Sequence, residues 1–586
     1  MSAPAEQQAD PTGLQSLAYR YLPILAWLPA YNRAQLMPDA IAALTVWALL
    51  VPEAMAYATI AGVPLEAGLY AAILPLFLYA IFGTSRQLIT GPSSTVAILS
   101  AATIAPLADG TEEFIALTAA LAILVGVILV VAGVARMGWV SQFMAKPVLE
   151  GFVIGLALVV LVGQADKLVG VDAEGDNFWQ EAWDIISSLG DAHLETAVIG
   201  VGSLVLLFTL ARFVPRAPGA LITVFLGIVI SAGLNLEDKG VHIVGDIPSG
   251  LPPFGLPDGI SLTDIQKLLP GAFAIVLVAY AESLAIAQSY ATKYKCAVDP
   301  NQELIALGLS NAGAGVSQGL VVDGSLSRTA AADSAGQKTQ MSSLINGALV
   351  IVTVLALTAL FQDLPEAVLG AIVVHAVWHL IDLKKLRAIY NVSKVDFWLA
   401  AICMLGVLTF DILAGLIIAV AVSLLVLIYR ASRPGIPVLG KDPDENVYHS
   451  IERHPESETY TGLIILRLDA ELFFANAAYF RDRVREQRAT TDPPARAILV
   501  DAEAIHDLDI TAAEMLKELA SELADDGIEL LFARVHQSVR EMMQRSGVED
   551  AIGGDHIYST IQDGVDDFLT RHPEAGRRDR PATRDT

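Results

Sequence analysis

Among the ionisable side chains inside long apolar stretches of the sequence, the notable ones are Glu53, Glu282 and Arg328. A charge at the centre of a bilayer costs about 2.5–3.5 kcal/mol on insertion scales, so each of these residues needs a partner or a function. Arginine binds oxyanions through a full positive charge and two parallel hydrogen bonds, and a buried carboxyl can bind and release a proton. These residue types indicate an anion site coupled to protons through Glu282 and Glu53. The alternative is an ion pair of Arg328 with Glu282 or Glu53 that only holds helices together.

Two segments with the same pattern follow the two glutamates along the chain. Residues 88–94 (Leu-Ile-Thr-Gly-Pro-Ser-Ser) and 321–327 (Val-Val-Asp-Gly-Ser-Leu-Ser) each consist of a short extended run, a glycine and the hydroxyl-rich start of a short helix. A helix that begins at mid-membrane directs unpaired N–H groups and a partial charge of about +0.5 toward its N-terminal side. Asp323 is predicted to cap the second short helix. Two such helix ends can form an anion site; the alternative is that these Gly and Ser residues only pack helices together.

The two segments belong to an internal repeat. Residues 53–58 (Glu-Ala-Met-Ala-Tyr-Ala) lie in the opening apolar stretch of the first half, and residues 282–287 (Glu-Ser-Leu-Ala-Ile-Ala) lie in its counterpart in the second half. Each half contains an odd number of predicted spans, so the second copy must be inverted relative to the first. Inverted repeats with helices interrupted near the midplane are typical of secondary transporters.

The apolar stretches that must position these residues are long enough to span a membrane. Of the 586 residues, 54% are apolar and 17% are charged, whereas soluble domains carry about a quarter charged residues. Candidate spans lie near residues 38–58, 66–82, 93–107, 114–135, 147–168, 196–214, 219–234, 268–290, 302–318, 325–336, 340–361, 364–381, 394–411 and 412–431. The predicted fold class is therefore an α-helical polytopic membrane protein with about fourteen spans of about 20 residues, two of them half-helices. The spans form a seven-plus-seven inverted repeat over about 36–234 and 266–434.

The loops between these spans alternate in charge. Acidic residues occupy one set of loops: Asp109, Glu112, Glu113, Asp172, Glu174, Asp176, Glu237 and Asp238. Basic residues occupy the other set: Arg136, Lys146, Arg212, Arg216, Lys293, Lys295, Lys384, Lys385 and Arg387. Because Lys and Arg gather in cytoplasmic loops, we expect both termini in the cytoplasm and a multi-pass protein of the cell inner (cytoplasmic) membrane. Residues 1–13 have no basic segment followed by an apolar one, so no cleavable signal peptide is predicted.

Composition argues against several other functions. The net charge of −26 is opposite to that of a nucleic-acid surface, which needs clustered Lys and Arg. The only cysteines, Cys296 and Cys403, exclude a disulfide framework or a Cys-rich metal site. His375 and His379 have no further ligand at metal spacing, and we interpret them as packing residues. No phosphate-binding glycine loop with a lysine occurs, so no ATP-driven motor is predicted. We predict a transporter and not an enzyme, with no metal and no cofactor.

The composition changes abruptly after residue 433. Short apolar runs at 463–466, 497–500 and 530–532 alternate with helix-like stretches at 475–488, 511–525 and 538–546. Strands alternating with helices predict a small α/β domain, which we place in the cytoplasm at 440–571. Residues 572–586 are rich in Arg, Asp and Pro and are predicted to be a disordered tail. The preceding divisions are a cytoplasmic N-terminal segment, 1–35, and a transmembrane transport domain, 36–434.

Several motifs resemble the sulfate permease (SulP) family of anion transporters. They are residues 51–58 (Val-Pro-Glu-Ala-Met-Ala-Tyr-Ala), 61–64 (Ala-Gly-Val-Pro), 68–70 (Gly-Leu-Tyr), 82–86 (Phe-Gly-Thr-Ser-Arg), 91–92 (Gly-Pro), 247–252 (Ile-Pro-Ser-Gly-Leu-Pro), 324–329 (Gly-Ser-Leu-Ser-Arg-Thr) and 338–340 (Lys-Thr-Gln). The resemblance covers most of residues 20–435 and implies core and gate domains, a homodimer and an elevator-type motion. The C-terminal domain is similar to the cytoplasmic STAS domain that ends such proteins.

The resemblance also implies which residues bind the anion. The positions that match the family's pocket are Glu53, Tyr57, Ser93, Ser94, Ser325, Ser327 and Arg328. Glu53 stands where many members have Gln, which places an acid beside the anion and indicates proton linkage. Bicarbonate-type members often lack a basic residue at the position of Arg328, so this residue favours sulfate or another divalent anion.

One further motif concerns the STAS-like domain. Residues 509–512 (Asp-Ile-Thr-Ala) resemble the family's Asp-Ser-Thr-Gly motif, whose serine can be phosphorylated. Ile510 occupies the phosphoacceptor position, which argues against a serine-phosphorylation switch. Thr511 is interpreted as a residue at the start of a helix.

These inferences predict a secondary transporter of inorganic anions, with sulfate and protons as the favoured substrates. The alternatives within transport are sodium–bicarbonate symport, dicarboxylate uptake and chloride exchange. An alternative of another class is an anion-gated sensor that signals through the STAS domain. The expected partners are the anion, protons or sodium as the coupling ion, the lipid bilayer, a second copy of the chain, and an unknown cytoplasmic partner of the STAS domain.

Overall fold

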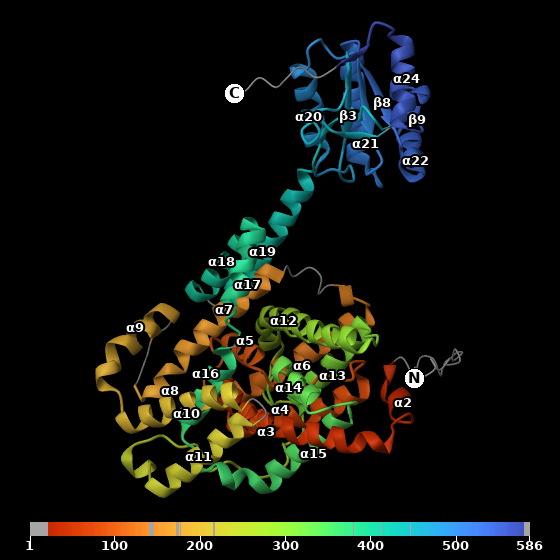
Figure 1. Ribbon diagram of the computed structural model, residues 1–586. Coiled ribbons are helices and arrows are strands. Elements are labelled where there is room, and N and C mark those ends of the chain that lie inside the picture. Colours follow the sequence, from red (N-terminus) through yellow and green to blue (C-terminus); the bar gives the residue numbers. More distant parts are fainter. Residues whose placement is uncertain are drawn as a thin grey trace. The chain divides into compact units, whose positions relative to one another are not determined.

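The computed structural model describes residues 21–139, 146–171, 175, 177–214, 217–378, 380–410, 412–445 and 447–578. The chain divides into two compact units, Met1–Ser423 and Leu424–Thr586. The first unit is built almost entirely of helices, and the second contains an eight-stranded sheet with helices packed on it (Figure 1).

The first copy of the repeat forms helices where the sequence has its long apolar runs. These helices are α3 (Leu36–Ala61), α4 (Leu65–Phe82), α5 (Ser94–Ile104), α6 (Thr111–Val134), α7 (Lys146–Gly163), α10 (Leu194–Phe213) and α11 (Gly219–Leu234). Shorter elements lie before and between them: α2 (Ile24–Trp27), η1 (Arg33–Gln35), α8 (Ala165–Val169), α9 (Phe178–Ser188), η3 (Leu189–Asp191) and η4 (Glu237–Lys239). Every span predicted in this half overlaps one of the seven apolar helices.

The second copy repeats this succession. Its helices are α12 (Leu262–Tyr294), α13 (Pro300–Val316), α14 (Leu326–Ser334), α15 (Met341–Val352), α16 (Glu366–Trp378), α17 (Leu383–Val392), α18 (Lys394–Thr409) and α19 (Ile412–Ser432). α15 continues through η5 (Thr353–Leu357) and η6 (Thr358–Phe361). Within the described residues, eight helices are long and apolar enough to cross a membrane. The half-helices α5 and α14 have only 11 and 9 residues, so the predicted polytopic helical fold with two half-helices is confirmed.

The two half-helices are brought together by a pair of two-residue strands. β1 (Thr90–Gly91) pairs antiparallel with β2 (Asp323–Gly324), with Gly91 opposite Asp323. Glycine at position 91 leaves room for the guanidinium of Arg328, because a Cβ atom there would lie 2.9 Å from its Nη1. α5 and α14 start directly after these strands and pack against α3, and α5 also packs against α12 (Figure 1).

The helices α9 and α17 are not predicted by the apolar-span pattern. Both are short and expose large apolar side chains beside charged ones, including Trp179 and Trp183 on α9 and Tyr390 on α17. Trp and Tyr are enriched where a membrane meets water, and amphipathic helices of this kind lie in the plane of that interface. A search for apolar runs of about 20 residues misses such helices because only one face of each is apolar.

The second unit is an α/β domain. Its strands are β3 (Val438–Lys441), β4 (Tyr448–Ser450), β5 (Thr459–Tyr460), β6 (Leu463–Arg467), β7 (Ala497–Asp501), β8 (Glu529–Ala533), β9 (Ile557–Tyr558) and β10 (Arg577–Arg578). Its helices are α20 (Ala477–Thr490), α21 (Ile510–Asp525), α22 (Gln537–Ser546), α23 (Val548–Ile552), η7 (Gly554–His556) and α24 (Ile561–Arg571). The strand order is β10-β5-β6-β7-β8-β9, β6 to β9 are parallel, and β3 pairs with β6 and β4. The three predicted strands and three predicted helices all overlap elements of this domain.

Alternate residues of the central strands pack on opposite faces of this sheet. Ile464, Ile498 and Leu530 contact the side that α20 to α23 cover, and Leu463 and Leu499 contact the side that α24 covers. This period of two is expected for strands, and a sheet covered on both faces reads in the sequence as the continuous apolar runs noted above.

The predicted boundary of the C-terminal tail differs from the structure. Residues 572–586 are expected to be disordered, but Arg577 and Arg578 form β10, which pairs with Tyr460 and Thr459 of β5. Strand pairing uses backbone groups, so the charged composition of this segment does not reveal it. Residues 579–586, and residues 1–20 of the predicted N-terminal segment, lie outside the described residues.

Candidate functional site

The N-terminal ends of α5 and α14 lie next to each other because β1 and β2 pair immediately before them. Ser93 is the N-cap residue of α5, with extended backbone angles. Ser325 is the N-cap residue of α14, and its hydroxyl accepts a hydrogen bond from the backbone N–H of Arg328 at 3.4 Å. The first N–H groups of a helix carry a partial positive charge, so two such ends side by side favour a bound anion.

Arg328 connects the two half-helices. Its side chain is completely buried, and Nη2 donates a hydrogen bond of 2.5 Å to the backbone carbonyl of Pro92, just before α5. Nε lies 3.9 Å from Oε2 of Glu53 on α3. Neither Nε nor Nη1 has a hydrogen-bond partner. The guanidinium therefore adds a full positive charge and unused donors to the helix ends, while its ion pair with Glu53 is long.

Glu53 and Tyr57 lie one turn apart on α3 and face the same place. Both residues are buried, 7% and 5% exposed, and Oε2 of Glu53 has no hydrogen-bond partner. Tyr57 lies within electrostatic range of Glu53, Arg328 and Asp323. Pro52 precedes Glu53 inside the helix, and a proline there removes one backbone hydrogen bond and bends the helix. α3 thus supplies an acid and a phenol beside the guanidinium.

Glu282 on α12 lies beside Asp323 rather than beside Arg328. The two carboxyl groups interact, and Thr95 on α5 is also close to Glu282. The N–H of Gly324 donates to the hydroxyl of Ser283 at 2.8 Å, which holds β2 against this part of α12. The prediction that Asp323 caps α14 is wrong, because Ser325 is the residue that accepts the capping hydrogen bond.

The structure gathers all the predicted site residues around one place. Ser94 and Ser325 are buried, Ser93 is half-buried and Ser327 is exposed, and the hydroxyls of Ser325 and Ser327 lie 3.1 Å apart. Sequence reasoning missed Asp323 as a member of the site, together with the neighbouring Thr95 and Ser283. The repeat contains a signal for Asp323. In the first copy the residue before the corresponding glycine is the uncharged Thr90, so an acid at this position is a difference between the two copies.

Buried polar side chains hold the extended segments that lead into the site. Glu303 on α13 is fully buried and accepts hydrogen bonds from the hydroxyl of Tyr79 (2.6 Å), the backbone N–H of Thr84 (2.8 Å) and the backbone N–H of Ser85 (3.2 Å). Asn311 donates to the carbonyl of Val322 and accepts from its N–H, both at 2.9 Å. Non-helical backbone inside a membrane protein needs such partners, because an unpaired polar group there costs free energy.

The segment that follows α14 contacts the chain before α5 and the start of α3. Nε2 of Gln340 donates to the carbonyls of Ser85 and Leu88, both at 2.9 Å. The buried carboxylate of Asp39 accepts from the backbone N–H groups of Lys338 and Thr339. The region containing the Lys-Thr-Gln motif therefore holds the segment that leads into α5 and contacts the start of α3.

We expect Glu303→Ala to destabilise the helical unit by about 3 kcal/mol or more, because each hydrogen bond to a buried charge is worth about 1.5–3 kcal/mol. Thermal unfolding of the purified variant measures this effect. Glu303→Gln keeps the volume and one acceptor and is expected to lose less stability. An alanine variant as stable as the wild type would contradict the structural role of this residue.

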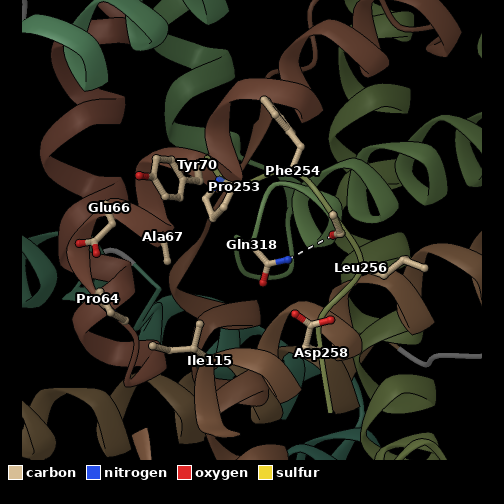
Figure 2. A pocket seen from close by; sticks show the side chains of 11 residues that line it. Pro64, Glu66, Ala67, Tyr70, Ile115, Pro253, Phe254, Leu256, Asp258 and Gln318 are labelled. Atoms are coloured by element: carbon tan, nitrogen blue, oxygen red, sulfur yellow. Dashed lines mark hydrogen bonds between the residues drawn. The ribbon is translucent and has the colours of Figure 1, made fainter. Parts of the chain in front are cut away.

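The helical unit also contains two cavities whose linings include none of the site residues named above. One of about 510 Å³ is lined by Glu66, Tyr70, Phe254, Asp258 and Gln318, among others, and Nε2 of Gln318 donates to the carbonyl of Gly255 there (Figure 2). A neighbouring cavity of about 410 Å³ is lined by Glu66, Asp246 and Glu366, among others. The charged residues that line both cavities are acidic, and no predicted site residue is among them. This lining disfavours an anion, so the half-helix ends remain the candidate site.

The other residues singled out in the sequence form no second candidate site in the described part of the chain. There, no three His, Cys, Asp or Glu side chains are placed to hold a metal ion. The ring of His375 packs edge-on against Phe208 with centroids 5.0 Å apart, and His379 lies outside the described residues. In the α/β unit, Asp509 caps α21 by accepting from the N–H of Ala512 at 2.8 Å, and Ile510 is 70% exposed.

Comparison with known proteins agrees with this architecture. The family model described as the sulfate permease family matches residues 36–403, and the STAS domain model matches residues 454–564. A Mycobacterium tuberculosis protein (strain H37Rv) named as a probable sulfate transporter is 39% identical over 542 residues, which cover 92% of this chain and 97% of that protein. The chloroplastic sulfate transporter 4.1 of Arabidopsis thaliana is 32% identical over 564 residues, covering 93% and 82%.

Among solved structures, the murine Solute Carrier 26 family member A9 anion transporter has the same fold. It is 24% identical in sequence, with a TM-score of 0.87 and coverage of 97% of both chains. The transmembrane domain of the cyanobacterial bicarbonate transporter BicA is 21% identical, with a TM-score of 0.56 over 67% of this chain and 98% of that one. With the family model and the relatives, these findings show that the chain belongs to the sulfate permease family, whose members are membrane transporters and not enzymes, and that it ends in a STAS domain.

Proposed function

We propose that this protein is a secondary active transporter that carries sulfate together with protons. The observation that carries the proposal is the buried guanidinium of Arg328, which retains two unused donor atoms between the ends of two half-helices. A divalent oxyanion gains more than a monovalent one from a full positive charge, because the Coulomb energy scales with the charge of the ligand. The relatives named as sulfate transporters point to the same substrate.

Each site residue has a distinct part in this proposal. Arg328 and the N–H groups of the half-helices bind the anion, and Ser93, Ser94, Ser325 and Ser327 supply hydroxyl donors. Tyr57 donates its phenol, and Glu53 balances the guanidinium when the anion is absent. Glu282 binds the proton that accompanies the anion. A carboxyl that is neutral when the anion is bound and ionised when it has left couples the two substrates.

We infer an elevator-type motion of a core domain against a gate domain in a homodimer. The transport domain comprises residues 36–434, the STAS domain comprises 440–571, and both termini lie on the cytoplasmic side of the cell inner membrane. The inverted repeat supports this view, because two related arrangements of the same helices present the site to either side in turn. The basic loops, which alternate with acidic ones, support the orientation.

Counterflow in proteoliposomes tests the function. Purified protein is reconstituted into vesicles loaded with unlabelled sulfate, and uptake of labelled sulfate is followed with and without competing chloride, bicarbonate and dicarboxylates. We expect sulfate to accumulate and to be competed best by other divalent oxyanions. Sodium-dependent uptake of bicarbonate would contradict the proposal and identify a bicarbonate symporter. Exchange of dicarboxylates or chloride without sulfate flux would identify one of the other transport functions. Binding of anions without any net flux would identify a sensor.

The STAS domain is expected to regulate and assemble the transporter rather than to conduct anions. It forms its own core on a separate unit of the chain and lies outside the predicted spans. Deletion of residues 440–586 should therefore lower expression, coupling or maximal rate while anion binding is retained. Binding of sulfate by the purified truncated protein measures this. Complete loss of binding in a truncated protein that is well folded would contradict the expectation.

A further inference from the structure

The half-helix α14 is preceded by a carboxyl group that the capping role does not explain. Asp323 is completely buried in β2, opposite Gly91, and neither of its carboxyl oxygens has a hydrogen-bond partner of normal geometry. A buried charged carboxyl without such a hydrogen bond is costly in a protein interior unless it binds a proton or interacts with a neighbouring group. The corresponding residue of the first repeat, Thr90, has no charge.

The neighbours of Asp323 come from every element packed around it. Glu282 on α12 carries the carboxyl group in contact with it, and Ser93 before α5 places a hydroxyl beside it. Arg328 on α14 and Tyr57 on α3 lie within electrostatic range. Arg328 contacts Glu53 and the carbonyl of Pro92. Its guanidinium does not form an ion pair with Asp323.

We propose that Asp323 and Glu282 form one proton-binding unit, in which the shared proton sets the pH range over which the anion is transported. Two carboxyl groups in contact inside a protein cannot both ionise freely, and they titrate as a pair rather than as separate residues. The negative charge of one carboxylate keeps the proton bound to the other carboxyl group. This inference rests on the proposed proton-coupled function and adds a second residue to its coupling site.

The position of the pair connects the proton to the anion. β2, which contains Asp323, leads directly into α14, whose first turn contains Arg328. The hydrogen bond from the N–H of Gly324 to Ser283 joins this strand to α12 next to Glu282. Uptake of a proton removes a negative charge from the residues next to the start of α14, within electrostatic range of Arg328, so a divalent anion binds more favourably. Release of the proton restores that charge and favours release of the anion.

Removal of the Asp323 charge tests the inference. Asp323→Asn keeps the shape of the side chain, and Asp323→Thr restores the residue type of the first repeat in case the amide disturbs folding. Without the neighbouring negative charge, Glu282 binds its proton less tightly. The pH at which sulfate uptake is half-maximal should therefore move to lower pH by about one unit or more. Uptake should still rise as the pH falls.

The matched control is Asp258→Asn, the same change at an exposed carboxyl outside the half-helix site, and its pH profile should equal that of the wild type. Thermal unfolding of each variant confirms that it is folded. An unchanged pH midpoint in a folded Asp323 variant overturns the inference even if sulfate uptake is normal. A wild type that takes up another anion instead of sulfate overturns the proposed substrate, and a midpoint shift measured with that anion still supports the proton-binding unit.

Discussion

Arg328→Ala is expected to weaken sulfate binding by roughly ten- to a hundredfold, because a charge-assisted hydrogen bond contributes about 1.5–3 kcal/mol. The half-helix ends supply only partial charges, so chloride affinity should fall by a smaller factor. Arg328→Lys should recover part of the loss, since it restores the charge without the two-pronged geometry of the guanidinium. Sulfate and chloride affinities are measured on the same purified variants. A fall in the sulfate-to-chloride affinity ratio shows that Arg328 binds the anion.

The competing interpretation is that Arg328 only holds the helices together through Glu53 and the carbonyl of Pro92. In that case the alanine variant would lose thermal stability while its preference for sulfate over chloride stayed the same. Arg212→Ala, at an exposed arginine near the end of α10, is the control for removal of one positive charge. An unchanged sulfate-to-chloride ratio in a folded Arg328→Ala protein would remove this residue from the anion site.

The sequence predicts the spans and the half-helices because their signals are local. Length and apolar composition locate each helix, and the repeated pattern of an extended run, a glycine and hydroxyl residues locates the two breaks. Glu53 lies on the opening helix of the first copy and Arg328 at the start of the second half-helix, so the repeat indicates that both belong to the same region. The sequence left Glu53 and Glu282 as alternative partners of Arg328, and the structure shows that Glu53 is the one that lies 3.9 Å from it.

The hydrogen bonds that hold the extended segments of the site have no such local signal in the sequence. Glu303 reads as an acid in the first turn of an apolar helix, and only the tertiary structure shows that it binds the chain at Thr84 and Ser85. Asp323 next to a helix start looks like a cap, and the true cap is two residues further on. In both cases the side chain's role depends on which distant segment packs against it, and one sequence does not carry that information.

Glu282→Gln is expected to flatten the pH dependence of sulfate uptake. With one proton bound per anion and protonation far from saturation, uptake by the wild type should rise up to about tenfold per unit decrease in external pH. The amide of glutamine resembles a permanently protonated carboxyl, so the variant should still exchange sulfate for sulfate while its rate stays nearly constant between about pH 5.5 and 7.5. Uptake and exchange are measured in the same proteoliposomes with an imposed pH gradient.

The structure makes this expectation more specific than the sequence does. Because Glu282 contacts Asp323 and not Arg328, its neutralisation should leave the anion-binding guanidinium intact, and sulfate affinity at low pH should stay close to that of the wild type. Glu112→Gln, at an exposed carboxyl in the first turn of α6, should keep the full pH dependence. If Glu282→Gln retained the wild-type pH profile, proton coupling would have to reside elsewhere, with Glu53 as the next carboxyl in the site. If wild-type flux instead required sodium and ignored pH, the coupling ion would be sodium and the carboxyl pair would have no part in proton transport.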